Sequence, residues 1–255
     1  MTHTTPNYLI GLDLGKKRDY TALAALRQRP VPTGRQERVQ AGFDLRYGTA
    51  YELAPIMERR YELLHLDRWR GRSYRDVVPE VQRVLAALHR VAHQDELEAT
   101  GVGRAIDPDI TFLADQTGVG EGVVNDIIRS AGLDVIGIVI TGGTVITRAH
   151  EEIHAPKREL VGRMEVVVEN RRLAIPSAEQ LPHADTLVAE LDNFQAKTNK
   201  LTGNDSYGAG EDWREHNHDD LVLAVAMAVW HGEDRNDAGN YSELDDYERA
   251  VFGGR

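Results

Sequence analysis

The segment from Leu221 to Trp230 restricts the possible folds of this chain more than any other, because ten consecutive residues there are apolar. It is too short to span a bilayer. A helix that is apolar on every face has to lie inside a core, surrounded by other elements. Asp219 and Asp220 precede it directly, and an acid in the first turn of a helix interacts favourably with the helix dipole. This explains one aspartate but not both, so the sequence predicts a buried helix with acidic side chains at its entrance.

The first third of the chain contains three runs that are typical of strands. Tyr8 to Leu14 and Thr21 to Leu26 are apolar runs joined by a polar turn, which predicts an antiparallel hairpin. Tyr61 to Trp69 alternates in polarity and predicts a third strand, with Leu64 and Arg68 on the same face.

The rest of the chain alternates between helical and extended patterns. A helix is expected to begin at Ser73, and Val135 to Ile140 is β-branched enough to be a buried parallel strand. This order predicts an α/β domain over residues 1–232, with a mixed β-sheet flanked by helices, and it matches an RNase H-like fold. Residues 233–255 are expected to form an acidic, flexible tail. Two segments are harder to assign: Gln36–Asp44 is a strand or part of an insertion, and Leu45–Arg60 has no clear pattern. The other expected elements are a strand over Ile110–Ala114, helices over Val123–Ala131, Lys157–Val168 and Ala184–Leu191, a short strand over Arg172–Ile175 and a loop over Asn199–Glu211.

Two further aspartates stand where predicted strands end. Asp13 lies between two glycines in Gly11-Leu12-Asp13-Leu14-Gly15, and Asp115 follows the run that ends at Ala114. Each has an ordinary explanation, as a turn residue or as a helix N-cap. Carboxylates held close together on rigid elements are costly unless a cation neutralises them. With Asp219 and Asp220 they predict a divalent-metal site and phosphoryl-transfer or nuclease chemistry, with Asp219 favoured over Asp220 as the direct ligand.

Five other side chains are candidates for supporting such a site. Lys157 begins a helix, and Arg70 and Arg72 lie in an arginine-rich segment, so all three are candidates for contacting phosphate. Asp19 and His218 are candidates for orienting the metal ligands, although hairpin and capping roles explain them equally well. The glycines after Asp115 lack the Lys-Ser/Thr of a P-loop, which argues against a Walker-type ATPase.

The composition restricts the partners and the compartment. The net charge of −11 argues against nucleic acid as a partner, but binding depends on local patches rather than on the sum. The chain has no cysteine, so any metal has to be held by oxygen or imidazole. Since the sequence has neither a signal-peptide pattern nor a membrane-spanning segment, we expect a cytoplasmic protein without a membrane partner.

Five motifs, in this order, resemble the nuclease domain of bacteriophage terminase large subunits. They extend over nearly the whole chain from Tyr8 to Trp230. The resemblance implies an RNase H-like fold and endonucleolytic cleavage of concatemeric double-stranded viral DNA during genome packaging. It also implies two Mg²⁺ or Mn²⁺ ions held by Asp13, Asp115 and the Asp219-Asp220 pair. The motifs are Gly11-Leu12-Asp13-Leu14-Gly15 with Asp19-Tyr20-Thr21-Ala22, Asp115-Gln116-Thr117-Gly118-Val119-Gly120, Ile140-Thr141-Gly142-Gly143, Pro156-Lys157-Arg158-Glu159-Leu160, and His218-Asp219-Asp220-Leu221-Val222-Leu223-Ala224.

Complete terminase large subunits also contain an ATPase motor, and no motor motif is found in this sequence. We therefore expect cleavage of double-stranded DNA without ATP hydrolysis. The expected partners are a separate packaging ATPase, a small terminase subunit and a portal, in the cytoplasm of the host cell.

Three other functions remain open at this point. A RuvC-like junction resolvase would share the fold and the acids. Gly11-Leu12-Asp13-Leu14-Gly15 also resembles the first phosphate loop of actin-like and sugar-kinase ATPases, although Lys16 and Lys17 replace their small hydroxyl residues. The third possibility is a non-catalytic packaging component that has kept the fold.

Overall fold

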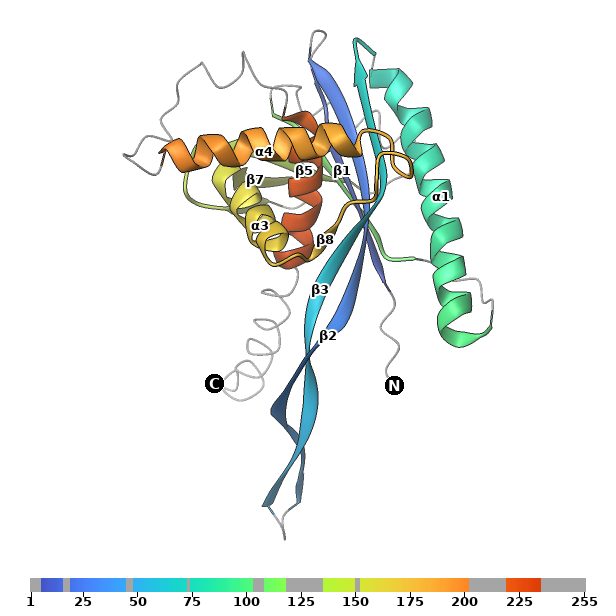
Figure 1. Ribbon diagram of the computed structural model, residues 1–255, viewed down its shortest axis with the longest axis vertical. Coiled ribbons are helices and arrows are strands. Elements are labelled where there is room, and N and C mark those ends of the chain that lie inside the picture. Colours follow the sequence, from blue (N-terminus) through green and yellow to red (C-terminus); the bar gives the residue numbers. More distant parts are fainter. Residues whose placement is uncertain are drawn as a thin grey trace, which may run out of the picture.

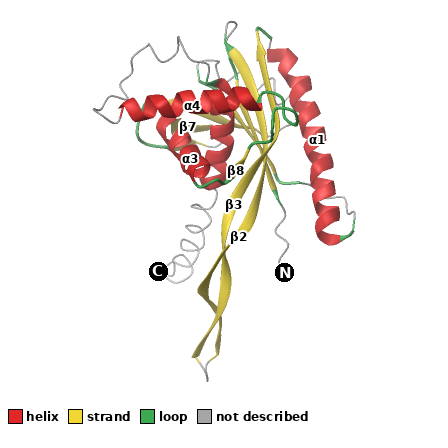
Figure 2. Ribbon diagram, in the orientation of Figure 1, coloured by secondary structure: helices red, strands yellow, loops and turns green. Residues whose placement is uncertain are grey.

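The computed structural model describes residues 6–15, 19–44, 48–72, 74–102, 108–117, 135–149, 152–201 and 219–234. Their centre is an eight-stranded mixed sheet with the order β6-β7-β5-β4-β1-β2-β3-β8, and helices cover both of its faces (Figures 1 and 2). The strands are β1 (Asn7–Asp13), β2 (Tyr20–Asp44), β3 (Gly48–Arg70), β4 (Ile110–Asp115), β5 (Val135–Thr141), β6 (Thr147–Ala149), β7 (Glu152–Pro156) and β8 (Leu173–Ala174). The helices are α1 (Tyr74–Thr100), α3 (Lys157–Glu169), α4 (Ala184–Leu201) and a last helix over residues 220–234.

The sheet has the predicted topology. β1, β2 and β3 form an antiparallel meander, and β4 and β5 continue the sheet in parallel on the other side of β1. The run β3-β2-β1-β4-β5 is the RNase H-like arrangement expected from the sequence, so the predicted fold class is confirmed. The strands β6 and β7 were not predicted, and they extend the sheet beyond β5.

The alternation along β1 divides the core into two layers. Tyr8, Ile10 and Leu12 are buried against α1, whereas Leu9 on the opposite face belongs to the cluster that contains the last helix. Among the described helices, α1 lies on one side of the sheet and α3, α4 and the last helix lie together on the other (Figure 1). Because β1 is central, its side chains are buried on both faces.

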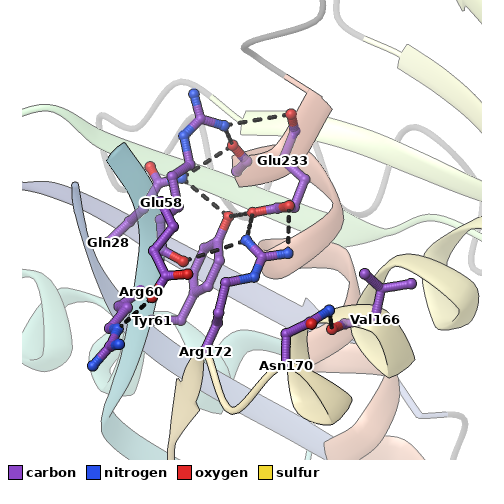
Figure 3. Close-up of polar contacts among 10 residues, drawn as sticks. Gln28, Glu58, Arg60, Tyr61, Val166, Asn170, Arg172 and Glu233 are labelled. Atoms are coloured by element: carbon purple, nitrogen blue, oxygen red, sulfur yellow. Dashed lines mark hydrogen bonds and ion pairs between the residues drawn. The ribbon is translucent and has the colours of Figure 1, made fainter. Parts of the chain in front are cut away.

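The last helix is the core of the second layer, as its composition predicts. No residue from Leu221 to Trp230 is more than 7% exposed. Its far end is held by a polar cluster (Figure 3), in which both guanidinium Nη atoms of Arg172 donate to the Glu233 carboxylate at 2.9 Å and the Tyr61 hydroxyl donates to it at 2.7 Å. Glu233 therefore belongs to the helix rather than to a tail, and residues 235–255 lie outside the described part of the chain.

β2 and β3 form a hairpin much longer than the rest of the sheet requires. They pair from Tyr20 and Arg70 out to Asp44 and Gly48, and the outer part projects away from the body of the molecule (Figure 1). No element in the described part of the chain covers the outer part, and Tyr51 and Leu53 are 52% and 67% exposed. Without a buried face it has no strict alternation, which is why residues 36–60 could not be placed securely from the sequence.

A β-bulge in β3 corrects the predicted faces of this strand. Ala25 pairs with His65 but Leu26 pairs with Leu63, which leaves Leu64 as an extra residue. Leu64 therefore packs in the layer of α1, whereas Leu63 lies in the layer of the last helix. The prediction that Leu64 shares a face with Arg68 is wrong, because one inserted residue reverses the alternation.

The helices differ from their predicted bounds mainly at their ends. α4 continues to Leu201, so Asn199 is helical rather than the start of a loop. The helix expected over Val123–Ala131 lies outside the described residues. No helix in the described part of the chain is long and apolar enough to cross a membrane.

Candidate active site

Asp13 and Asp115 end neighbouring parallel strands. Gly11 pairs with Leu113 and Leu12 with Ala114, so the next residues in this register are the two aspartates. Adjacent strands lie about 4.8 Å apart, and residues in register point to the same face. Both aspartates are buried, with 7% and 8% exposure. The sheet therefore places two carboxylates side by side, on the face that carries the last helix.

Gly11 brings the last helix against β1. A Cβ atom at Gly11 would lie 1.9 Å from the carbonyl oxygen of Ala224, so only a residue without a side chain allows this approach. Asp13 lies two residues beyond Gly11 on the same face of the strand. Asp220 lies four residues before Ala224, about one helical turn and about 6 Å along the axis. The close contact thus brings the first turn of the last helix toward the end of β1.

The pKa of Asp13 reflects this gathering of acids. Burial is the largest cause of its strong upward shift, and the negative charges of Asp115, Asp220 and Asp219 raise it further, in that order. The ammonium group of Lys157 acts in the opposite direction. Acids from β1, β4 and the last helix therefore interact electrostatically, as expected from the sequence. Asp220 influences Asp13 more strongly than Asp219 does.

The two aspartates of the last helix have different basic partners. Lys157 Nζ donates to Asp219 Oδ2 at 2.7 Å, and Arg68 Nη2 donates to Asp220 Oδ2 at 3.0 Å. Lys157 reaches Asp219 because β7 ends at Pro156 and α3 begins with the lysine itself. Of the residues predicted from the sequence, the structure thus brings Lys157 directly to the acids.

Glu190 and Arg68 lie beside the site, and neither was predicted from the sequence to belong to it. Glu190 Oε2 accepts hydrogen bonds from the backbone N–H groups of Leu221 and Val222 at 3.0 and 3.2 Å, and its other oxygen lies 3.3 Å from Arg68 Nη1. The sequence feature that could have indicated Glu190 is its position on the apolar face of α4, three residues after the buried Leu187. An acid at such a position is rarely left without partners.

The residues after Asp115 form a rigid support for it. The Thr117 N–H donates to Asp115 Oδ1 at 2.7 Å, and the Thr117 hydroxyl accepts from the N–H of Ile140 at 2.7 Å. The Gln116 side chain lies over Gly137, where a Cβ atom would be 2.3 Å from its amide nitrogen. The Asp-Gln-Thr sequence therefore fastens the end of β4 to β5 and orients the Asp115 carboxylate.

Of the two remaining phosphate candidates, Arg70 lies beside this centre, whereas Arg72 points toward α1, which covers the other side of the sheet. Arg70 is exposed, and its guanidinium lies 5.5 Å from the Tyr20 ring on which Arg68 stacks at 3.8 Å, so it borders the site. Arg72 pairs with Glu80 at 3.1 Å. Their binding of phosphate stays a prediction.

Asp19 and His218 were expected to orient the ligands. Asp19 is exposed and precedes β2 directly. His218 lies outside the described residues. A role for either of them at the site also stays a prediction.

The four acids suit a hard divalent cation by their chemistry, since they offer only carboxylate oxygen. Their mutual repulsion around Asp13 is of the kind that a cation relieves. Within the described residues, however, no group of three or more acidic, histidine or cysteine side chains is already arranged to hold an ion. Asp219 and Asp220 are engaged by Lys157 and Arg68, so an ion would have to share these carboxylates with the basic side chains.

Two solved structures are similar to this chain. The large terminase nuclease from thermophilic phage G20c has 19% sequence identity and a TM-score of 0.39, with 89% of each chain covered. The same nuclease with bound magnesium has 19% identity and a TM-score of 0.37, covering 90% of this chain and 88% of that one. Both belong to the group that the five motifs resemble. No protein-family model and no curated protein matches the chain.

Proposed function

We propose that this chain is a divalent-metal-dependent DNA endonuclease of the terminase large-subunit type. The observation that carries the proposal is the meeting of Asp13, Asp115, Asp219 and Asp220, from three separate elements, on one face of the sheet. Four acids around a buried position are costly to the fold, and their chemistry is that of a site for divalent cations. We propose concatemeric double-stranded viral DNA as the substrate, cut during genome packaging.

The residues divide into ligands and substrate contacts. Asp13, Asp115, Asp219 and Asp220 would hold Mg²⁺ or Mn²⁺, two ions being our expectation. Such cations supply Lewis-acid polarisation of a phosphodiester and lower the pKa of a water molecule. Lys157, whose ammonium group already lies among the acids, would exchange part of its contact with Asp219 for a phosphate oxygen. Arg70, exposed at the border of the site, would bind the DNA backbone.

The experiment that tests the proposal is cleavage of supercoiled plasmid with Mg²⁺, Mn²⁺ or EDTA. We expect nicking with either metal and none in EDTA. Asp13→Asn and Asp115→Asn should each reduce the rate by roughly 100-fold or more, because each removes a charged ligand. Asp185→Asn, an exposed acid in the first turn of α4, is the matched control and should cleave like the wild type. Nicking by the two site variants at the wild-type rate would overturn the assignment.

A second substrate separates this proposal from a junction resolvase. A packaging nuclease should cut linear duplex DNA at least as fast as a four-way junction of the same sequence. A strong preference for the junction would instead favour the RuvC-like function. Addition of ATP should change neither rate, because we expect cleavage without ATP hydrolysis.

A further inference from the structure

Glu190 occupies an unusual position for an acid. It lies on the buried face of α4, with a side chain 6% exposed, and it accepts the N–H groups of Leu221 and Val222 in the first turn of the last helix. These N–H groups have no partner within their own helix. The carboxylate that caps the last helix is therefore supplied by a different helix, which fixes the position of the first turn against α4.

Arg68 connects this cap to the acidic site. Its Nη1 atom lies 3.3 Å from Glu190 Oε1, while its Nη2 atom donates to Asp220 Oδ2 at 3.0 Å. Its guanidinium stacks 3.8 Å above the Tyr20 ring, and only 11% of its side chain is exposed. The planar guanidinium can contact two carboxylates at once, which the single ammonium group of a lysine does less well.

Two other elements thus converge on Asp220 at the start of the last helix. The backbone that follows it is held by α4 through Glu190, and its carboxylate is held by β3 through Arg68. We propose that Arg68 and Glu190 are positioning residues of the acidic site, which orient the Asp220 carboxylate toward Asp13 without touching metal or substrate. The inference rests on the proposed function, because it assigns Asp220 to a metal site. A purely structural helix cap would stabilise the helix but would not act through Asp220.

The test is a double-mutant cycle on Mn²⁺ affinity, measured by titration calorimetry. Arg68→Lys keeps the charge, so a change in affinity cannot come from net charge alone. We expect it to weaken Mn²⁺ binding about tenfold, the usual effect of losing a residue that orients a ligand. In an Asp220→Asn background the same substitution should change the affinity by less than about twofold, because the group it positions is gone. An equal effect in both backgrounds, or none in either, would overturn the role of Arg68.

Glu190→Gln tests the second residue. The glutamine keeps an oxygen for the two N–H groups but replaces the second carboxyl oxygen, which faces Arg68, by an amide nitrogen that cannot accept from it. We expect a urea midpoint close to that of the wild type and a weakening of Mn²⁺ binding that again depends on Asp220. Wild-type Mn²⁺ binding by this variant would show that Glu190 is only a cap. Arg60→Lys, an exposed arginine on the same strand, is the control and should bind Mn²⁺ normally.

The two proposals fail in different ways. Mn²⁺ binding without plasmid nicking by the wild-type protein would overturn the proposed nuclease but leave the cycle interpretable. Absence of Mn²⁺ binding by the wild-type protein would overturn both.

Discussion

At the scale of single residues, Gly11 determines how closely the last helix approaches β1. Gly11→Ala would place a methyl group 1.9 Å from the Ala224 carbonyl oxygen. The carbonyl is part of the backbone and the methyl group is bonded directly to it, so neither can rotate away. The helix therefore has to move. We expect a loss of about 1–3 kcal/mol in the free energy of unfolding, as for other overpacked cores. Plasmid nicking should fall as well, because the displaced helix carries Asp220. Urea denaturation and the nicking rate measure the two effects.

Gly42→Ala is the matched control for this substitution. Gly42 lies in the projecting part of β2, and a Cβ atom there would meet nothing within 4 Å. Its effect on unfolding should stay within about 0.5 kcal/mol. Equal losses in the two variants would mean that loss of glycine flexibility, rather than contact with the helix, is responsible.

The four acids could be selected as candidates from the sequence, whereas their neighbours Glu190 and Arg68 could not. Asp13, Asp115 and the Asp219-Asp220 pair stand next to strand ends or a helix start, and this local context is visible in the sequence. Glu190 and Arg68 look like ordinary residues of a helix and a strand. Their role depends on which elements meet, and only the folded chain shows that α4 and β3 meet at the start of the last helix.

At the scale of elements, Asp95 fastens α1 to the sheet. It accepts hydrogen bonds from the Tyr8 hydroxyl at 2.6 Å and from Arg27 at 2.7 Å, and Arg29 also pairs with it. Burial alone would raise the pKa of Asp95, but the hydrogen bonds from Tyr8, Arg29 and Arg27 outweigh it and lower the pKa below its ordinary value. The ionised form of Asp95 is therefore the form that stabilises the fold.

We expect Asp95→Asn to lower the free energy of unfolding at pH 7 by about 2–4 kcal/mol, because it removes the buried charge on which the Tyr8 hydroxyl, Arg27 and Arg29 converge. A lowered pKa means that the stabilisation is complete above the unfolded-state pKa of about 3.9 and is lost as the pH falls further. The difference between wild type and variant should therefore shrink below about pH 4. Urea midpoints measured between neutral and acidic pH test this.

Glu62→Gln is the control for Asp95→Asn. Glu62 also pairs with Arg27, but 43% of its side chain is exposed. An exposed pair contributes about 0–1 kcal/mol, so the variant should resemble the wild type at every pH. A difference at Asp95 that persists undiminished to pH 3 would contradict the role of its ionised form.

Elements with a buried face were predicted well, and elements without one were not. β1, β4 and β5 are apolar and short, and each was expected close to its observed position. The outer part of the β2–β3 hairpin is paired backbone with exposed side chains, so burial left no pattern in its sequence. The bulge at Leu64 could not be predicted either, because Leu63 and Leu64 are adjacent leucines and the sequence does not indicate which of them continues the alternation.

At the scale of the whole molecule, the last helix is held at both ends by other parts of the chain. Glu190 and Arg68 hold its first turn, and Arg172 and Tyr61 hold Glu233 at its end. The sheet supplies the remaining two acids from adjacent strands. The relative position of the four carboxylates is thus a property of the assembled layers, and the sequence could predict that they meet only through the order of the elements.

The charge distribution of the whole molecule leads to the last prediction. With a net charge of −11 and four acids gathered at one site, we expect the protein to bind DNA weakly in EDTA. Replacing both Asp13 and Asp115 by asparagine should strengthen binding of a labelled duplex about three- to tenfold at low salt, with a smaller gain at higher salt because of screening. Asp185→Asn combined with Asp192→Asn removes two carboxyl groups from the exposed face of α4 instead. Fluorescence anisotropy should show a clearly smaller gain for this pair, because DNA is expected at the acidic site and not along α4. Equal gains for the two pairs would mean that DNA responds to the total charge, and that the acidic site is not where it binds.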